Sequence, residues 1–217
     1  MKVKELLRTD IPTITQNTTG NMALLIMEEY KTSHLIILSE TEFKGIVDQE
    51  SILEMEDLTK ELNTIISQTK KISLSINNHI CIAIKTFSEH KVSIIPIFEE
   101  NKYYGYITMA DIIYKIGHPY QLTEIGILTI ECTIEDYSLS EISRLIEQNE
   151  GKVMSSFVQI NPNSKNIHVD IIVNQKNLTR IIKSLRRFKW NVTETYDTAL
   201  FEKLDNRFDS FLRYLNT

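Results

Sequence analysis

Two stretches of the chain decide the fold, and they repeat one another 60 residues apart. Residues 33–52 read SHLIILSETEFKGIVDQESI, and residues 93–112 read SIIPIFEENKYYGYITMADI. Each contains a run of branched apolar residues, a polar loop, and a second apolar run that begins at a glycine, Gly45 or Gly105. Runs of this length and branching predict buried β-strands joined by a hairpin loop. The repeat therefore predicts two copies of one small α/β unit.

The repeat extends well beyond these strands. It runs without a gap from Thr13–Leu53 against Ser73–Ile113, and equivalent positions are identical at Gly45 and Gly105, Ala23 and Ala83, Glu29 and Glu89, Lys31 and Lys91, Ser33 and Ser93, Ile37 and Ile97, and Ile52 and Ile112. The pattern predicts strand, helix, strand, strand, helix in each copy. Copy one covers about residues 1–56 and copy two about residues 68–117. Between them, the apolar spacing predicts a connecting helix over Glu54–Gln68.

The string Gly105-Tyr106-Ile107-Thr108-Met109-Ala110-Asp111, with the strand before it, resembles the signature of a CBS domain. Two copies in tandem, over residues 1–120, resemble a CBS pair, also called a Bateman module. The resemblance implies an α/β fold of two β-α-β-β-α repeats and a sensing role without catalysis. It also implies a ligand in the cleft between the copies: AMP, ADP, ATP or S-adenosylmethionine.

Within that resemblance, Thr108 and Asp111 are the candidate ligand-binding residues. A hydroxyl near the start of a helix suits an anionic phosphate, and a carboxylate can accept hydrogen bonds from both hydroxyls of a ribose. Ile72, Ile95 and Pro96 are the expected apolar walls around the adenine. The alternative is structural, because Thr108 or Asp111 could simply cap the helix that begins at Ala110.

Copy one departs from the pattern. Asp48 and Ser51 occupy the positions of Thr108 and Asp111. A carboxylate repels phosphate, so we expect an adenine ligand at the second site only. His34 lies where some relatives carry a base that contacts phosphate, and it is therefore a candidate ligand contact. The other interpretation is a solvated histidine at a strand edge.

The second half of the chain has a different pattern. His118-Pro119-Tyr120 is expected to break the preceding helix, and a new domain is expected over residues 121–197. Alternating runs predict strands at 127–134, 153–160, 167–173 and 190–196. Apolar spacing predicts helices from Leu139, closed by Gly151, and from Leu178 to Phe188. The order β-α-β-β-α-β is the ferredoxin-like, α+β arrangement.

This order resembles an ACT domain, and a CBS pair followed by an ACT domain resembles regulators of the acetoin-utilisation protein B type. ACT domains that bind an amino acid usually place a glycine in the loop before the first helix. Here that loop, residues 135–139, has two carboxylates and no glycine. A role in dimerisation and packing is therefore favoured over amino-acid binding.

Residues 198–217 carry apolar side chains at helical spacing and predict a C-terminal helix. Its apolar residues are Leu200, Leu204, Phe208, Phe211, Leu212 and Leu215. An apolar face of this size has to be covered, either by the second domain or by a partner chain. Because both domain types commonly associate about two-fold axes, we expect a homodimer.

The composition excludes several other classes. The net charge of −5 argues against nucleic-acid binding, and two distant cysteines argue against a disulfide framework or a zinc ribbon. The N-terminus lacks the apolar core of a signal peptide, and no apolar run approaches the ~20 residues of a membrane span. We therefore expect a cytoplasmic protein without a membrane segment, metal, cofactor or catalytic residue.

The sequence favours a non-catalytic regulator that senses an adenine nucleotide through the second site and acts on an unidentified protein partner. One alternative is a structural or adaptor dimer with no small ligand. Another is amino-acid sensing by the ACT-like domain.

Overall fold

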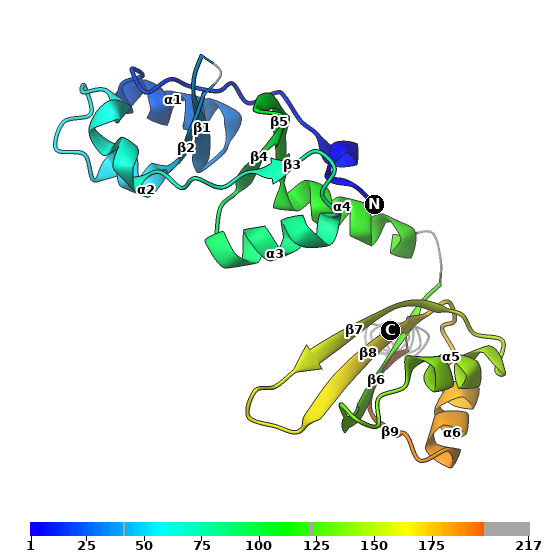
Figure 1. The fold of residues 1–217 in the computed structure, drawn as a ribbon. Coiled ribbons are helices and arrows are strands. Elements are labelled where there is room, and N and C mark those ends of the chain that lie inside the picture. Colours follow the sequence, from blue (N-terminus) through cyan, green and yellow to red (C-terminus); the bar gives the residue numbers. More distant parts are fainter. Residues whose placement is uncertain (41, 122–123, 198–217) are drawn as a thin grey trace, which may run out of the picture. The chain divides into compact units, whose positions relative to one another are not determined.

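The computed structural model describes residues 1–40, 42–121 and 124–197, and it divides into two compact units between Gly117 and His118 (Figure 1). Each unit has its own hydrophobic core and is described separately. The predicted C-terminal helix over 198–217 lies outside the described residues. None of the described helices is long and apolar enough to cross a membrane.

The first unit contains the two copies of the repeat, with helices and strands at equivalent positions. Copy one has α1 (Gly20–Tyr30), β1 (His34–Ser39), β2 (Glu42–Asp48) and α2 (Gln49–Leu53). Copy two has β3 (Leu74–Ser75), α3 (Ile80–His90), β4 (Ile94–Glu99), β5 (Lys102–Thr108) and α4 (Met109–Gln121). The counterpart of β3 in copy one is a single parallel bridge between Ile14 and Ile37. The mixed α/β repeat predicted from the sequence is confirmed.

Each hairpin contains a bulge next to its glycine, where Lys44 or Tyr104 is the extra residue. The register shifts between Ile37 and Leu38 in copy one and between Ile97 and Phe98 in copy two. Gly45 and Gly105 adopt φ angles of +141° and +142°, which side chains other than glycine rarely tolerate. The bulge occurs in both copies, so it does not depend on Pro96 of β4, where copy one has Ile36.

The segment before each copy crosses to the other copy. The backbone of Arg8 exchanges hydrogen bonds of 2.8 and 2.9 Å with Tyr106 of β5, and the backbone of Lys70 exchanges two of 2.9 Å with Ile46 of β2. Val3 and Ile46 are accordingly buried in the core of copy two. This exchange fixes the two copies against each other.

The prediction of a connecting helix over Glu54–Gln68 is wrong. Only a short 3₁₀ helix forms, η2 (Leu62–Gln68), which buries Leu62 and Ile65. The backbone before it bonds back to copy one instead: Gly20 N–H donates to the Lys60 carbonyl at 3.1 Å, and Leu62 N–H donates to the Thr18 carbonyl at 2.9 Å. These bonds require an extended path that a continuous helix cannot follow. The N-terminus begins with a second 3₁₀ helix, η1 (Val3–Leu6).

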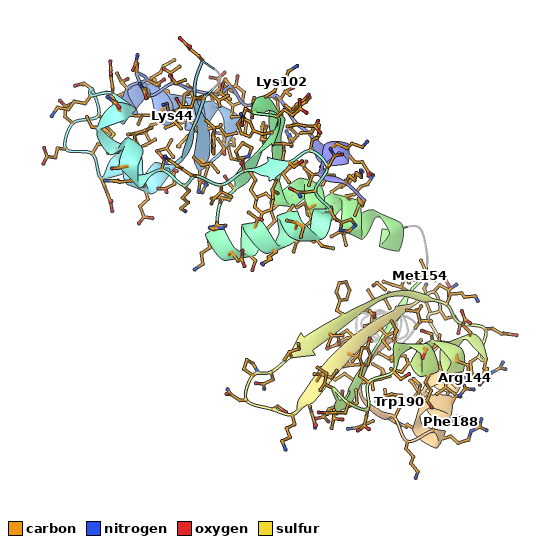
Figure 2. The ribbon with its side chains drawn as sticks, viewed as in Figure 1. Lys44, Lys102, Arg144, Met154, Phe188 and Trp190 are labelled. Atoms are coloured by element: carbon orange, nitrogen blue, oxygen red, sulfur yellow. The ribbon has the colours of Figure 1, made fainter. Side chains whose placement is uncertain are left out.

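The second unit has the predicted β-α-β-β-α-β order. Its elements are β6 (Gly126–Thr133), α5 (Leu139–Glu147), β7 (Val153–Ile160), β8 (Asn166–Val173), α6 (Thr179–Arg187) and β9 (Asn191–Asp197). The strands form an antiparallel sheet in the order β7-β8-β6-β9, the ferredoxin-like arrangement. The helices α5 and α6 share one core with the sheet, and Arg144 of α5 lies 5.6 Å from the ring centre of Phe188 (Figure 2).

Two local predictions are wrong. The α4 helix continues to Gln121, so His118-Pro119-Tyr120 does not break it. A proline so near the end of a helix removes only one backbone hydrogen bond, from a turn that is already incomplete. After α5, the left-handed residue is Glu150, with φ +64°, and not Gly151. A Cβ on Gly151 would lie 2.8 Å from Ile146, so this glycine serves close packing instead.

Candidate functional site

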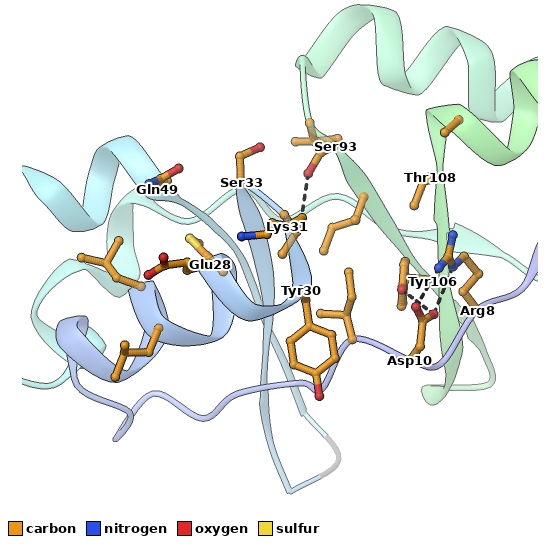
Figure 3. A pocket seen from close by; sticks show the side chains of 18 of the residues that line it. Arg8, Asp10, Glu28, Tyr30, Lys31, Ser33, Gln49, Ser93, Tyr106 and Thr108 are labelled. Atoms are coloured by element: carbon orange, nitrogen blue, oxygen red, sulfur yellow. Dashed lines mark hydrogen bonds and ion pairs between the residues drawn. The ribbon is translucent and has the colours of Figure 1, made fainter.

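A cleft of about 1260 Å³ opens in the first unit, between the two copies. Copy one lines it with residues of α1, the turn after α1, and α2. Copy two lines it with residues at the start of β4, the end of β5 and the first turn of α4, and the N-terminal segment adds Arg8, Asp10 and Ile11. Figure 3 shows these groups on opposite sides of the cleft. Its volume is sufficient for a ligand of nucleotide size.

One wall of the cleft is apolar. It is formed by Leu24, Leu25, Met27 and Tyr30 of α1, and Ile94 of β4, which is 1% exposed, adjoins the cleft on the side of copy two. Leu25 is 61% exposed and Tyr30 is 37% exposed. Large exposed apolar side chains around a concavity are typical of a surface that receives a flat apolar group.

Thr108 and Asp111 bond to each other at the start of α4. The Thr108 hydroxyl donates to Asp111 Oδ2 at 2.6 Å, the Thr108 N–H donates to the same oxygen at 3.1 Å, and the Asp111 N–H donates to the Thr108 hydroxyl at 3.1 Å. This reciprocal pair forms a capping box, which is the structural role considered from the sequence. It orients the carboxylate, and among the residues that the structure describes Asp111 Oδ1 has a single contact, to Arg8 Nη1 at 3.4 Å.

The sequence reasoning missed a cluster formed by Arg8, Asp10 and Tyr106. Arg8 holds Asp10 through two contacts, Nε to Oδ1 at 3.0 Å and Nη2 to Oδ2 at 2.7 Å. The fully buried Tyr106 donates its hydroxyl to Asp10 Oδ1 at 2.7 Å. The hydrogen bonds from Arg8 and, to a smaller extent, from Tyr106 hold the pKa of Asp10 well below its usual range. Burial and the Asp10 carboxylate raise the pKa of Tyr106 to about 12. The cluster lies beside Thr108 in the cleft.

Copy one has its own helix cap at the position equivalent to Thr108 and Asp111. Asp48 caps α2 by accepting the Ser51 N–H at 2.8 Å, and Lys70 Nζ lies 4.0 Å from Asp48 Oδ2. Burial raises the pKa of Asp48, but the Ser51 hydrogen bonds and the Lys70 charge together lower it below its usual value. Asp48, Ser51 and Lys70 do not line the cleft.

The structure brings only part of the predicted site together. Thr108 lines the cleft, and Asp111 adjoins it through Thr108 and Arg8. Ile72, Ile95 and Pro96 do not line it. Both Ile94 and Ile95 are buried, but successive side chains of β4 point to opposite faces. Ile94 adjoins the cleft, whereas Ile95 belongs to the core of copy two, against which Ile72 also packs. Pro96 is buried within the sheet and pairs with Tyr106.

His34 is 8% exposed, so the interpretation as a solvated histidine is wrong. Its Nδ1 atom lies 3.0 Å from the Ser93 hydroxyl and 3.3 Å from the Ser93 backbone nitrogen, which joins the two copies. Burial lowers the pKa of His34, and the nearby Lys70 lowers it further against the opposing charge of Asp48. Within the described residues, its Nε2 atom has no hydrogen-bond partner. It does not line the cleft.

Comparison with known proteins bears directly on the first unit. The family profile of the CBS domain matches residues 3–57 and 66–118. A CBS domain pair/ACT domain protein from Thermotoga maritima is 24% identical, with a TM-score of 0.49 over 55% of this chain and 98% of its own. A protein from Vibrio cholerae named for acetoin utilization is 19% identical, with a TM-score of 0.49 over 56% and 94%.

A third similar structure is a CBS domain pair in complex with 5′-methylthioadenosine and S-adenosyl-L-methionine. It is 22% identical, with a TM-score of 0.46 over 55% of this chain and 98% of its own. The two profile matches fall on the two copies of the internal repeat. Residues 3–118 of this chain are therefore a tandem pair of CBS domains.

Proposed function

We propose that this protein is a non-catalytic regulator whose CBS pair binds an adenosine-containing ligand in the cleft, with the ribose at Asp111. CBS pairs are in general regulatory modules that bind ligands of this class. The proposal extends this family property to a particular site in this chain, and it includes an unidentified protein partner that responds to the ligand.

The observation that carries the proposal is the state of the Asp111 carboxylate. Thr108 fixes Oδ2 with two hydrogen bonds, while the one contact of Oδ1 with the described part of the chain is the long one to Arg8. A carboxylate has about four lone-pair positions, so Oδ1 retains the capacity to accept from a ribose hydroxyl. The carboxylate is thus held in place before the ligand arrives, which reduces the entropic cost of binding.

The adenine then requires a different wall from the one expected from the sequence. Leu24, Leu25 and Tyr30 of α1 and Ile94 of β4 supply an apolar surface inside the cleft. We propose that these side chains take the place of Ile72, Ile95 and Pro96 in contacting the base. Asp48 keeps the equivalent position in copy one negatively charged, which opposes a phosphate there.

A structural or adaptor role is the second candidate, and one observation favours it. Thr108 and Asp111 form a reciprocal helix cap, and a cap of this kind has a structural role without any ligand. The second unit has the element order expected of an ACT-like domain, and we propose association rather than amino-acid binding as its role. In its first loop, the Thr133 hydroxyl donates to Asp136 at 2.7 Å.

A thermal-shift experiment on the full chain separates these candidates. The probes are adenosine, AMP, ATP and S-adenosylmethionine. A ligand at 100 times its Kd stabilises the folded state by about 2.7 kcal/mol. This corresponds to a rise in Tm of about 5–10 °C.

Asp111→Asn keeps an acceptor for the cap but loses the charge, and it should abolish the rise. Asp48→Asn makes the same change at the cap of α2 and should leave the rise intact. If no adenosine compound shifts the wild-type Tm, the adaptor role is favoured and the ligand-binding proposal fails.

A further inference from the structure

The second unit concentrates positive charge around α6. Residues 171–193 contain six basic residues and no Asp or Glu, although the chain as a whole has a net charge of −5. Four of the basic residues lie among the nine residues of α6. The exposed basic residues of α6 and of the turn after it are Arg180, Lys183, Arg186, Arg187 and Lys189. The outer surface of α6 is therefore strongly basic.

This pattern of charge opposes the helix that carries it. Arg180, Lys183 and Arg187 are three and four positions apart, so their like charges are neighbours on one face of α6. The helix dipole favours the two arginines of the last turn, but it opposes Arg180 in the first turn, which has no acidic residue and no side-chain cap. Because the row of cations does not help the helix to form, we look for its role in binding.

These charges are not neutralised by the described part of the chain. None of the five side chains forms an ion pair there. Arg186 makes one long hydrogen bond, from Nη2 to the Val192 carbonyl at 3.4 Å. By contrast, Lys176, which precedes the helix, is paired with Glu124 at 3.2 Å. The charge of α6 is thus available to a further anion.

Two guanidinium groups flank one exposed aromatic ring at the end of α6. The ring centre of Phe188, which is 42% exposed, lies 5.2 Å from Arg187 Cζ and 5.6 Å from Cζ of Arg144 on α5 (Figure 2). Contact with an aromatic face restricts a long side chain, and a planar guanidinium can bind a carboxylate through two parallel hydrogen bonds. The ring thus holds two carboxylate-binding groups close together, which reduces the entropic cost of binding.

We propose that α6 and the adjoining Arg144 form a docking surface for an acidic segment of a partner protein, with carboxylates of that segment on Arg144 and Arg187. Charge complementarity carries the assignment, because a run of Asp and Glu residues matches the row of cations. A nucleic acid fits less well. Glu141 and Glu147 lie three positions on either side of Arg144 and oppose a phosphate backbone that extends beyond the row.

The surface provides a contact for the protein partner of the proposed function, but it does not depend on a ligand in the cleft. Fluorescence anisotropy of the full chain with a labelled decaglutamate peptide tests it. We expect saturable binding that weakens at least about tenfold when NaCl is raised from about 50 to about 500 mM, because exposed charges are screened. A decaglutamine peptide should bind at least about tenfold more weakly than decaglutamate.

Arg144→Gln combined with Arg187→Gln tests the two guanidiniums. The double variant should bind decaglutamate about tenfold more weakly, which is about threefold for each exposed charge that is lost. Lys85→Gln combined with Lys102→Gln removes two exposed cations from the first unit, one of them beside an aromatic ring, and should keep the full affinity. Phe188→Leu keeps every charge and should lower the affinity about threefold, because the guanidiniums are no longer held.

Each outcome bears on a separate part of the proposal. If decaglutamate binds neither the full chain nor the chain without 199–217, or binds the double arginine variant as tightly as the wild type, the docking surface is overturned. Tighter binding of a single-stranded thymidine 10-mer overturns the choice of a protein partner. Residues 199–217 contain Glu202, Asp205 and Asp209, so binding that appears only after their removal makes this segment the occupant and overturns the external partner. Since no probe contains adenosine, a failure of the ligand-binding proposal is distinguishable from a failure here.

Discussion

Gly105 shows how a single residue positions one side of the cleft. Its backbone, at φ +142°, lies against the carbonyl oxygen of Arg8, and a Cβ would collide with that oxygen. The close approach lets Arg8 pair with Tyr106 and brings the guanidinium to Asp10 and Asp111. A glycine at such a position lets another backbone or a ligand approach closely. In the structure, it admits the N-terminal segment.

Gly105→Ala should therefore lower the free energy of unfolding of the first unit by about 1–3 kcal/mol, the usual cost of a strained backbone position. Gly117→Ala is the control, because a Cβ there meets nothing within 4 Å and alanine favours a helix. Chemical denaturation of the full chain measures both. Equal stability of Gly105→Ala and the wild type would show that Arg8 does not depend on this close approach.

His34 should make stability depend on pH. Burial lowers its pKa below the usual 6.5, with Lys70 and Asp48 as its charged neighbours. Below pH 6.5 the unfolded chain binds a proton that the folded chain does not, so stability falls as the pH drops toward the folded pKa. The slope can reach about 1.4 kcal/mol per pH unit. Stability is retained above pH 6.5.

Denaturation of wild type and His34→Gln at pH 7.5, 6.5 and 5.5 checks this expectation. Glutamine keeps an acceptor for the Ser93 N–H but does not titrate, so the variant should lose less stability between pH 6.5 and 5.5. The same loss in both proteins would assign the pH dependence to other groups.

At the scale of elements, local patterns predicted most of the structure. The β7 strand occupies the predicted range 153–160. The helices α1 and α3 lie at equivalent positions because the same apolar pattern occurs in both copies of the repeat. The helix predicted for segment 54–61 does not form because the carbonyls of Leu58 and Lys60 accept from the N–H groups of Asn21 and Gly20, and helical spacing cannot reveal such contacts. The Arg8–Asp10–Tyr106 cluster was missed for the same reason, since Tyr106 is 96 positions from Asp10.

The Tyr106 hydroxyl connects β5 to the N-terminal segment through its hydrogen bond to Asp10. Removal of this hydroxyl tests how much the contact contributes to stability. Tyr106→Phe should lower the free energy of unfolding by about 1–3 kcal/mol, because a bond to a charged group is lost inside the protein. Tyr104→Phe, at an exposed position of the same strand, should change it by less than about 0.5 kcal/mol. Equal effects of the two substitutions would show that the bond to Asp10 contributes nothing.

At the scale of the whole molecule, the repeat exposes apolar side chains at equivalent positions. Leu53 of α2 is 58% exposed and Ile113 of α4 is 64% exposed; Met22 and Ile82, at another equivalent pair, are 52% and 46% exposed. Large aliphatic groups left in water at both members of a pair are consistent with an interface between two copies of the chain. This bears on the homodimer expected from the sequence, for which residues 198–217 were the first candidate surface.

We predict a homodimer of twice the 25.2 kDa chain mass in light scattering at micromolar concentration. Burial of one leucine or isoleucine contributes about 1.5–3 kcal/mol, so Leu53→Glu combined with Ile113→Glu should weaken the dimer at least tenfold. Lys85→Glu, an exposed change on α3, is the control. Removal of 199–217 tests the other candidate surface separately. A monomeric mass for the full-length wild type would exclude the dimer. A dimer that is weakened only by the truncation would assign the interface to the C-terminal residues and not to α2 and α4.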